Sequence, residues 1–259
     1  MIRLKSAGEI ERIFAAGEIV AGTLELVASS VEPGVTTTDL DRIAEEYIRD
    51  HEGAEPAFKG LYGFPATLCT SVNEEVVHGI PSAARRLSDG DLVSVDVGVK
   101  LDGMFADAAV TVPVGIVSPK AERLLRVTRE SLDVGVAEAR PGARLGDVGA
   151  AIQEHVERAG FSVIRELVGH GVGHEPHEPP HVPNFGKRGR GDRLQPGLVI
   201  AIEPMVNIGS REIRTLADGW TVVTADGDLS AHFEHTVAVT ADGPRVLTVR
   251  PETADLTEE

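Results

Sequence analysis

Residues 90–96 read GDLVSVD, and residues 197–203 read GLVIAIE. Both stretches are continuous apolar runs that close on a carboxylate, Asp96 in the first and Glu203 in the second, and these acids lie 107 residues apart. An apolar run of this length is typical of a strand that is buried on both faces. The two stretches therefore predict two central strands, each with an acidic residue at its tip.

A second segment repeats at nearly the same spacing, and a third repeats in the same order. Residues 32–50 (EPGVTTTDLDRIAEEYIRD) and 140–158 (RPGARLGDVGAAIQEHVER) each read as a Pro-Gly turn followed by an amphipathic helix. Asp107 and Glu234 each precede a β-rich run. Chance explains one such likeness, but three in the same order favour a duplicated α/β half.

The boundary between the two halves is expected at residues 118–119. Ser118 would cap a helix that begins at Pro119, because proline is well suited to the first helical position. This gives halves of about 1–118 and 119–250, and residues 251–259 form an acidic tail. The first helix is expected to start at a capping box made by Ser6 and Glu9.

Two related halves would pack about a pseudo-twofold axis and bring their strand-tip acids together. These acids are Asp96, Asp107, Glu203 and Glu234. Any one acid alone is more simply paired with an arginine or exposed, but apolar residues flank both Asp96 and Glu203. Buried acids cost free energy unless they are paired. A divalent cation of the Mn, Fe, Co or Zn type would hold them together.

Residues 169–181 (GHGVGHEPHEPPH) contain four of the nine histidines. His170 and His174 have the i, i+4 spacing of two ligands on one helical face. The glycines and Pro176 make a helix improbable there, so the helical zinc motif is rejected. In an extended segment successive side chains alternate in direction, so some of these histidines point away from any site.

Composition excludes several classes of protein. The net charge of −16 argues against DNA binding, since such proteins present basic faces to phosphate. Cys69 is the single cysteine, so no intramolecular disulfide forms. No run is long enough to span a membrane, and the charged N-terminal segment is unlike a signal peptide. We therefore expect a cytoplasmic location with no membrane contact.

Five motifs in order resemble the type I methionine aminopeptidases. They are NEEVVHGIP (73–81), SVDVGVKLDGMFAD (94–107), GHGVG with HE (169–178), AIEPM (201–205) and FEHT (233–236). The resemblance covers nearly the whole chain. It implies the α+β pita-bread fold, with two pseudo-symmetric α/β halves around a central antiparallel sheet, as a single catalytic domain over residues 1–259.

The resemblance also implies a dinuclear metal site. Asp96 would chelate one divalent cation, Asp107 and Glu234 would bridge both, and His170 and Glu203 would complete the other. The cations would be Co²⁺, Mn²⁺, Fe²⁺ or Zn²⁺. The segment around Asn73 resembles one whose backbone binds a monovalent cation such as Na⁺, although Glu75 replaces an apolar residue there.

Catalytic roles follow from the same resemblance. Glu203 would move the proton of a water molecule to the leaving amine, His177 would contact the tetrahedral intermediate, and His78 would contact the substrate amide. His235 is left open between a supporting role and packing. The remaining histidines are interpreted as solvated loop residues: His51, His155, His174, His181 and His232.

The resemblance implies removal of the N-terminal methionine of nascent polypeptides, preferentially before a small second residue. The methionine pocket would be lined by Phe58, Leu61, Phe64, Cys69, Pro176 and Trp220. The chain is expected to act as a monomer. The basic island GKRGRGDR (186–193) is open to two interpretations, ribosome contact or a solvated loop.

Two alternatives remain. An Xaa-Pro aminopeptidase or prolidase-like hydrolase would share the five ligands, but it usually carries a whole domain before them. A non-catalytic pita-bread binding protein would lose ligands, whereas this chain has all five together with His78 and His177. Peptide hydrolysis discriminates among the three.

Overall fold

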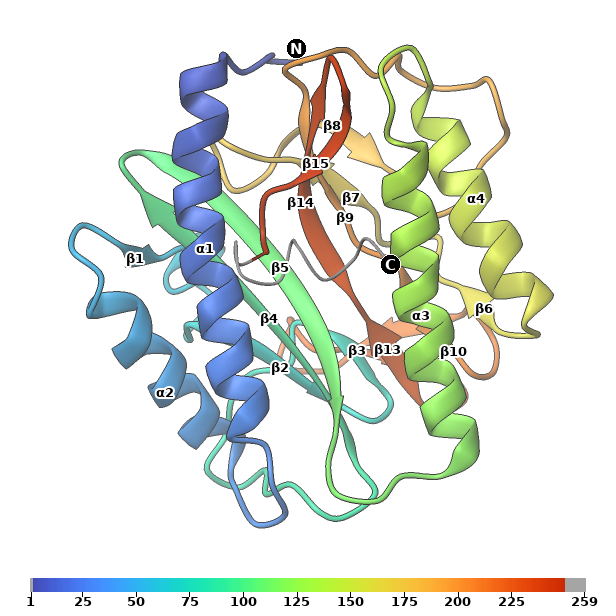
Figure 1. Ribbon diagram of the computed structural model, residues 1–259. Helices are drawn as coiled ribbons and strands as arrows, with labels where there is room; N and C mark the ends of the chain where they lie inside the picture. Colours follow the sequence, from blue (N-terminus) through green and yellow to red (C-terminus); the bar gives the residue numbers. More distant parts are fainter. Residues whose placement is uncertain (1, 250–259) are drawn as a thin grey trace.

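A computed structural model describes residues 2–249, so the acidic tail expected at 251–259 lies outside the described residues (Figure 1). Its α-helices are α1 (Ala7–Ser29), α2 (Thr37–Arg49), α3 (Pro119–Glu138) and α4 (Leu145–Arg158). A short 3₁₀ turn, η1, spans Leu61–Gly63. The helices expected within 32–50 and 140–158 are confirmed as α2 and α4.

The helix starts follow from local side-chain chemistry. The Ser6 N–H donates to Glu9 Oε2 at 2.8 Å, and the Glu9 N–H donates to Ser6 Oγ at 3.3 Å, so the expected capping box of α1 is present. The Ala121 N–H donates to Ser118 Oγ at 3.2 Å, and Pro119 opens α3 as expected. Among the described residues, none of the helices has the length and apolar character needed to span a bilayer.

The strands are short except for the central hairpin. In chain order they are β1 (Glu55–Pro56), β2 (Leu68–Val72), β3 (Glu75–Val77), β4 (Leu92–Leu101), β5 (Met104–Pro113), β6 (Ser162–Val163), β7 (Gly169–Gly171), β8 (Glu178–Val182), β9 (Val199–Ile202), β10 (Met205–Asn207), β11 (Ile213–Thr215), β12 (Val222–Thr224), β13 (Ser230–His232), β14 (Glu234–Thr240) and β15 (Gly243–Val246). Within residues 2–249, the main sheet has nine strands that run β1-β4-β5-β14-β9-β7-β8, with β2 on β4 and β15 on β14. Every pairing in it is antiparallel.

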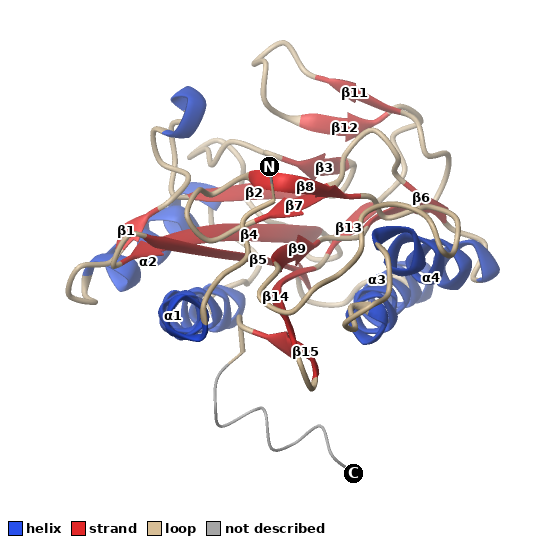
Figure 2. Cartoon of the chain, turned by 90° about the horizontal axis from the view of Figure 1, so that it is seen from above, coloured by secondary structure: helices blue, strands red, loops and turns tan. Residues whose placement is uncertain are grey.

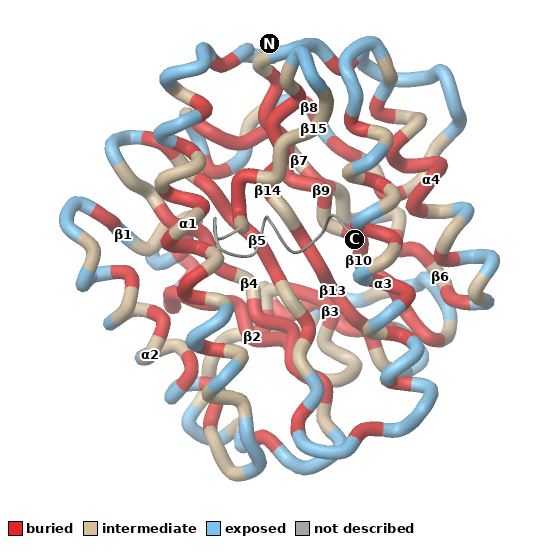
Figure 3. The backbone as a smooth tube through the Cα atoms, viewed as in Figure 1, coloured by how far each residue is buried: buried red, intermediate tan, exposed pale blue. Residues whose placement is uncertain are grey.

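The sheet separates two layers. Helices α1, α3 and α4 lie on one side, and β3, β11 and β12 lie on the other (Figure 2). One apolar core packs mainly α1 and α2 on β4 and β5, and a second packs α3 and α4 on β9 and β14. The strands between them are largely buried, while exposed residues gather on the outer helix faces and in the loops (Figure 3).

The turns that precede α2 and α4 repeat the same hydrogen bonds. The Gly34 N–H donates to the Leu87 carbonyl at 2.8 Å, and the Gly142 N–H donates to the Leu194 carbonyl at 2.9 Å. These pairs are offset by 108 and 107 residues, the spacing found in the sequence. Such recurrence is expected when two halves share one ancestral backbone.

One expectation about the strands is wrong. Asp96 lies in the middle of β4, which continues to Leu101, and Asp107 lies inside β5. The hairpin is longer than the apolar run suggests, because alternating residues after Asp96 extend both strands to the turn at Asp102. Glu203 directly follows β9 and Glu234 begins β14, so these two acids do stand at strand ends.

Gly17 gives a test of the packing of α1. A Cβ at this position would overlap the backbone carbonyl of Leu247, which cannot move aside as a flexible side chain would. We expect Gly17→Ala to destabilise the fold by about 2–3 kcal/mol, which lowers the Tm by about 5–10 °C. Gly8→Ala on the same helix is the control, since no described atom outside the helix backbone lies within 4 Å, and should stabilise by about 0.5–1 kcal/mol. Equal melting curves for the two variants would contradict this packing.

Candidate metal centre

Strand register places three carboxylates on one face of the sheet. Asp96 on β4 pairs with Ala109 on β5, and Glu234 on β14 pairs with the same Ala109. Asp107 precedes Ala109 by two residues, and residues two apart on a strand share a face. Asp96, Asp107 and Glu234 therefore project from three neighbouring strands into one space.

The other side of the centre comes from β9 and β7. Ile202, the last residue of β9, pairs with His235, so Glu203 comes beside Glu234. Strand β7, which carries His170, pairs with β9. The register therefore brings all five residues predicted as ligands to one part of the sheet.

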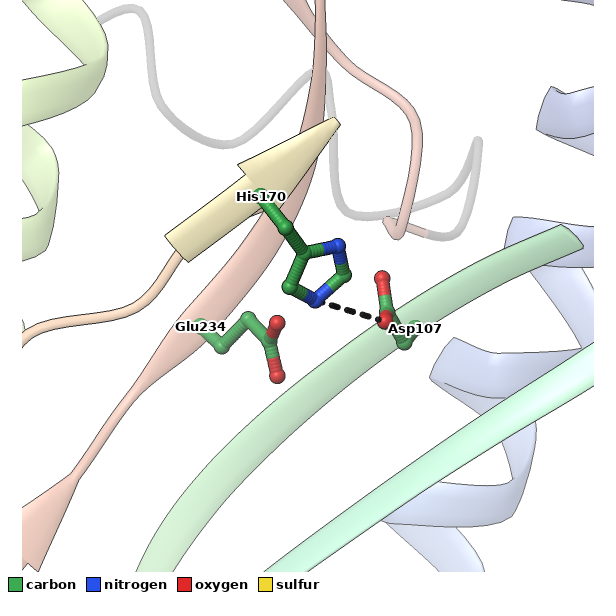
Figure 4. Close-up of side chains that lie close together, drawn as sticks. All are labelled: Asp107, His170 and Glu234. Carbon is green, nitrogen blue, oxygen red and sulfur yellow. Dashed lines mark ion pairs between the residues drawn. The ribbon is translucent and has the colours of Figure 1, made fainter. Parts of the chain in front are cut away.

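Side-chain distances agree with this register. Ligand atoms of Asp107, His170 and Glu234 lie within 4.8 Å of one another (Figure 4). His170 Nε2 is 3.4 Å from Asp107 Oδ2 and 3.6 Å from Glu203 Oε1. His170 Nδ1 lies 2.9 Å from the Gly171 carbonyl and donates to it, which leaves the Nε2 lone pair facing the acids. This is the tautomer that a metal ligand requires.

The charges of the acids are not balanced by basic side chains. Burial raises the pKa of all four carboxyl groups, and the neighbouring acidic charges raise the pKa of Asp96, Glu203 and Glu234 further. Asp96 Oδ1 is buried without a hydrogen-bond partner. Within the described part of the chain, no lysine or arginine lines the cavity beside them. Carboxylate oxygens with an imidazole nitrogen fit a divalent transition metal, so the residues suit the group that they were predicted to bind.

Asp107 is held across the boundary between the two halves. The Asp107 N–H donates to Thr236 Oγ1 at 3.1 Å, and that hydroxyl lies 3.0 Å from Asp107 Oδ1. Thr236 is fully buried on β14. A hydroxyl of the second half thus orients a carboxylate of the first, a support that is commonly found around metal ligands.

The acids line a cavity of about 420 Å³, which also has an apolar wall. The wall contains the pocket residues Phe58, Leu61, Phe64, Cys69 and Trp220. Phe64 and Trp220 meet edge to face, with ring centroids 5.2 Å apart. Burial raises the pKa of the Cys69 thiol, so it remains protonated and serves as wall. Pro176, also expected in this wall, is buried but does not line the cavity.

His78 and His177 lie in the same cavity. His78 follows β3 with φ +59°, a strained conformation that is frequent at functional sites. Burial lowers its pKa. Burial, followed by the charges of His170 and His78, lowers the pKa of His177 to about 4, although its side chain reaches solvent at the cavity mouth. The His170 and His177 rings meet edge to face with their centroids 4.4 Å apart, so His177 lies beside the ring that approaches the acids.

The interpretation of His232 as a solvated loop residue is wrong. His232 is 2% exposed, lines the cavity, and has its Nε2 atom 3.9 Å from Glu203 Oε2. The signal was present in the sequence, because His232 stands two residues before Glu234 in an extended run and thus shares its face. Tyr62 was also missed. Its ring stacks on His177 at the mouth, with centroids 6.1 Å apart.

The other histidines are not simply solvated. His174 Nε2 lies 2.8 Å from Glu9 Oε1, and His155 on α4 lies 3.1 Å from a Glu130 oxygen. His51 contacts the Tyr47 carbonyl, and His235 contacts the Thr248 hydroxyl. His181 is exposed, as expected, but it also lines the cavity mouth.

The chain is similar in sequence and in structure to known metallopeptidases. Residues 11–241 match metallopeptidase family M24. The chain is 56% identical over 249 residues to a methionine aminopeptidase of Clostridium perfringens, covering 96% of this chain and 99% of that protein. A crystal structure of methionine aminopeptidase from Thermotoga maritima has a TM-score of 0.95 at 47% identity, covering 96% of this chain and 100% of that one. A prolidase of Pyrococcus horikoshii, 24% identical, shares the fold with a TM-score of 0.77, and 64% of its chain is covered. The expected pita-bread fold is confirmed.

Proposed function

The chain belongs to metallopeptidase family M24 and, within it, to the methionine aminopeptidases, and from this membership we propose that it hydrolyses the bond after an N-terminal methionine with the help of two divalent cations. One observation carries the proposal. The five side chains proposed as ligands line one cavity with an apolar wall, and we propose that the two halves of the chain form a single catalytic domain around it. The preferred substrates are peptides in which a small residue follows the N-terminal methionine.

The cations would be Co²⁺, Mn²⁺, Fe²⁺ or Zn²⁺. The proposed ligands are Asp96, Asp107, His170, Glu203 and Glu234. Support comes from the buried acids, which have raised pKa values and no cationic side chain beside them among the described residues. When bound, the cations polarise the scissile carbonyl and lower the pKa of water from about 15.7 towards 7.

Glu203 is the proposed proton carrier. Burial and the charges of Asp96 and Asp107 raise the pKa of its carboxyl group, so it holds a proton more readily than an ordinary glutamate. Its carboxylate takes the proton of the attacking water and passes it to the leaving amine. A single carboxyl group can carry this proton if it reaches both the water and the leaving amine within the cavity.

His177 and His78 are the proposed contacts to the reacting amide. A pKa of about 4 keeps His177 neutral near pH 7, so it has one ring N–H to donate to the developing oxyanion. His78, which lines the same cavity, holds the scissile amide nitrogen. The methionine side chain of the substrate packs against the apolar wall, where Phe58, Phe64 and Trp220 would contact its flexible thioether.

The partners follow from the substrate. We propose action on nascent polypeptides in the cytoplasm, as a monomer. The basic segment 186–193, exposed from residue 187 onward, would face the ribosome. A monovalent cation such as Na⁺ is proposed beside Asn73. The carboxyl group of Glu75 lies next to this segment, where it accepts a hydrogen bond from the Val72 N–H at 2.7 Å.

A peptide assay tests the proposal. Metal-free protein receives Mn²⁺, Co²⁺, Fe²⁺ or Zn²⁺ in turn and is offered Met-Ala-Ser, Met-Leu-Ser or Ala-Pro-Ala. We expect methionine release that is faster from Met-Ala-Ser than from Met-Leu-Ser, and none after chelation with EDTA. Release of alanine from Ala-Pro-Ala in preference would indicate an Xaa-Pro aminopeptidase. A lack of turnover with every cation would indicate a binding protein.

A further inference from the structure

A buried ion pair lies behind strand β7, which carries His170, and the start of β8, which directly follows His177. Lys5 Nζ contacts Glu178 Oε1, with side-chain exposures of 0% for Lys5 and 6% for Glu178. Lys5 Nζ also donates to the Arg3 carbonyl at 3.1 Å. Removing one partner of such a pair strands the other charge away from water. The arrangement therefore depends on both residues.

The ion pair is on the reverse side of the backbone that presents His177. Glu178 begins β8 and pairs with Gly171 of β7, the residue after His170. His177 lines the cavity, whereas Glu178 does not. Any shift of Glu178 is therefore transmitted through one peptide unit to His177.

The N-terminal segment is fixed independently of Glu178. The Lys5 N–H donates to the Gly197 carbonyl at 2.6 Å, just before β9. Gly173 covers the Lys5 stem so closely that a Cβ there would lie 2.6 Å from Lys5 Cε, and its φ of +140° favours glycine. The Phe105 N–H donates to the Gly173 carbonyl at 2.8 Å. Lys5 thus has a rigid base from which to hold Glu178.

A second contact holds the same loop. His174 Nε2 lies 2.8 Å from Glu9 Oε1, and Glu9 also closes the capping box at the start of α1. His174 Nδ1 lies 3.9 Å from Glu178 Oε2. Lys5, just before α1, and Glu9, in its first turn, therefore hold the loop 173–178 at two places, and both places adjoin Glu178.

We infer that Lys5 is a positioning residue for His177 and acts through Glu178. The inference rests on the proposed function, in which His177 contacts the transition state. Without the Lys5 charge, the buried Glu178 carboxylate turns towards water and draws the start of β8 with it. A displacement of this kind at a catalytic group lowers the rate strongly, because its geometry must match the reacting atoms.

Lys5→Met tests the inference in a double-mutant cycle with His177→Ala. We expect Lys5→Met to lower kcat for Met-Ala-Ser roughly 10- to 100-fold, with KM and bound Mn²⁺ per chain unchanged. In the His177→Ala background the same change should alter kcat by less than about twofold, because the group that Lys5 positions is absent. Equal fold losses in both backgrounds, or loss of Mn²⁺, would overturn the inference.

Val27→Ala is the matched control for stability. Val27 is fully buried on α1, so truncation lowers the Tm without disturbing the ion pair, and kcat measured well below the Tm should stay unchanged. If Lys5→Met fails to fold, Glu178→Gln enters the same cycle, since the amide keeps the size of the side chain but removes the charge that pairs with Lys5. The same result is expected, a lower kcat that disappears in the His177→Ala background. If the wild type hydrolyses the peptide but the effects of the two substitutions on kcat are additive, the role of Lys5 is refuted and the proposed function stands. If the wild type does not hydrolyse the peptide, the proposed function is refuted as well.

Discussion

Asp107→Asn will abolish both metal retention and hydrolysis. Asp107 Oδ2 lies 3.4 Å from His170 Nε2, and Asp107 shares a face with Asp96 and Glu234, so in the proposed site it would contact both cations. An amide keeps the shape but loses the negative charge and one of the two acceptor oxygens. Loss of a supporting contact alone commonly costs 10- to 100-fold in affinity, so loss of the bridge should cost more than about 100-fold.

The measurement is Mn²⁺ bound per chain after gel filtration, together with kcat/KM for Met-Ala-Ser. Asp102→Asn is the control, because Asp102 is exposed at the turn of the same hairpin and undergoes the same chemical change. It should keep both cations and the wild-type rate. A variant of Asp107 that retained two cations would remove this residue from the site.

Addition of Mn²⁺ should reverse the order of the melting temperatures of the wild type and Asp107→Asn. Without Mn²⁺, Asp107→Asn should melt at or above the wild-type Tm, because it removes one of several buried charges whose mutual repulsion disfavours the fold. With Mn²⁺ at 100 times its Kd, the wild type should gain about 2.7 kcal/mol while the variant gains little. The same order of melting temperatures with and without Mn²⁺ would contradict the idea that these acids are held together by cations.

His177→Ala should give the opposite combination, retained cations and a lost rate. The centroid of its ring lies 4.4 Å from that of the proposed ligand His170, yet His177 is proposed to contact only the oxyanion. Removal of one such donor typically costs about 10²–10³ in kcat, or roughly 2.7–4 kcal/mol. KM should change little, because the contact strengthens only as the transition state forms.

Elemental analysis after dialysis, with kcat and KM for Met-Ala-Ser, checks this expectation. His155→Ala serves as the control for loss of an imidazole, since His155 lies on the outer helix α4 and pairs with Glu130. It should leave the rate and the cations unchanged. Metal loss in the His177 variant would show that the proposed division between ligand and catalytic histidines is wrong.

The sequence predicted the parts of the fold that leave a local pattern. The capping box at Ser6, the start of α3 at Pro119 and the paired turns before α2 and α4 depend on residues close together in the chain. Convergence of Asp96 and Glu203 could be predicted because duplication adds a long-range relation to local patterns. The strand ends could not, because the length of the β4–β5 hairpin depends on pairing between strands and the apolar run alone does not record it.

The sequence pattern alone does not assign roles to the individual side chains of the candidate site. His170 and His177 were separated from their neighbours by family resemblance, since alternation alone left the four histidines of 169–181 open. The prediction that His232 is solvated is wrong, because His232 is buried. Its position two residues before Glu234 does indicate that the two side chains share a face. The Lys5–Glu178 pair joins residues 173 positions apart, and no periodicity links them.

The support that Thr236 gives to Asp107 has a consequence for synthesis. Glu234 and Thr236 lie on β14, one of the last strands to leave the ribosome, whereas Asp107 is made much earlier. A growing chain that has folded only its first half has an incomplete and poorly oriented set of acids. If the proposed site is right, hydrolysis therefore requires β14 to have docked between β5 and β9, so an unfinished copy would not cleave other proteins.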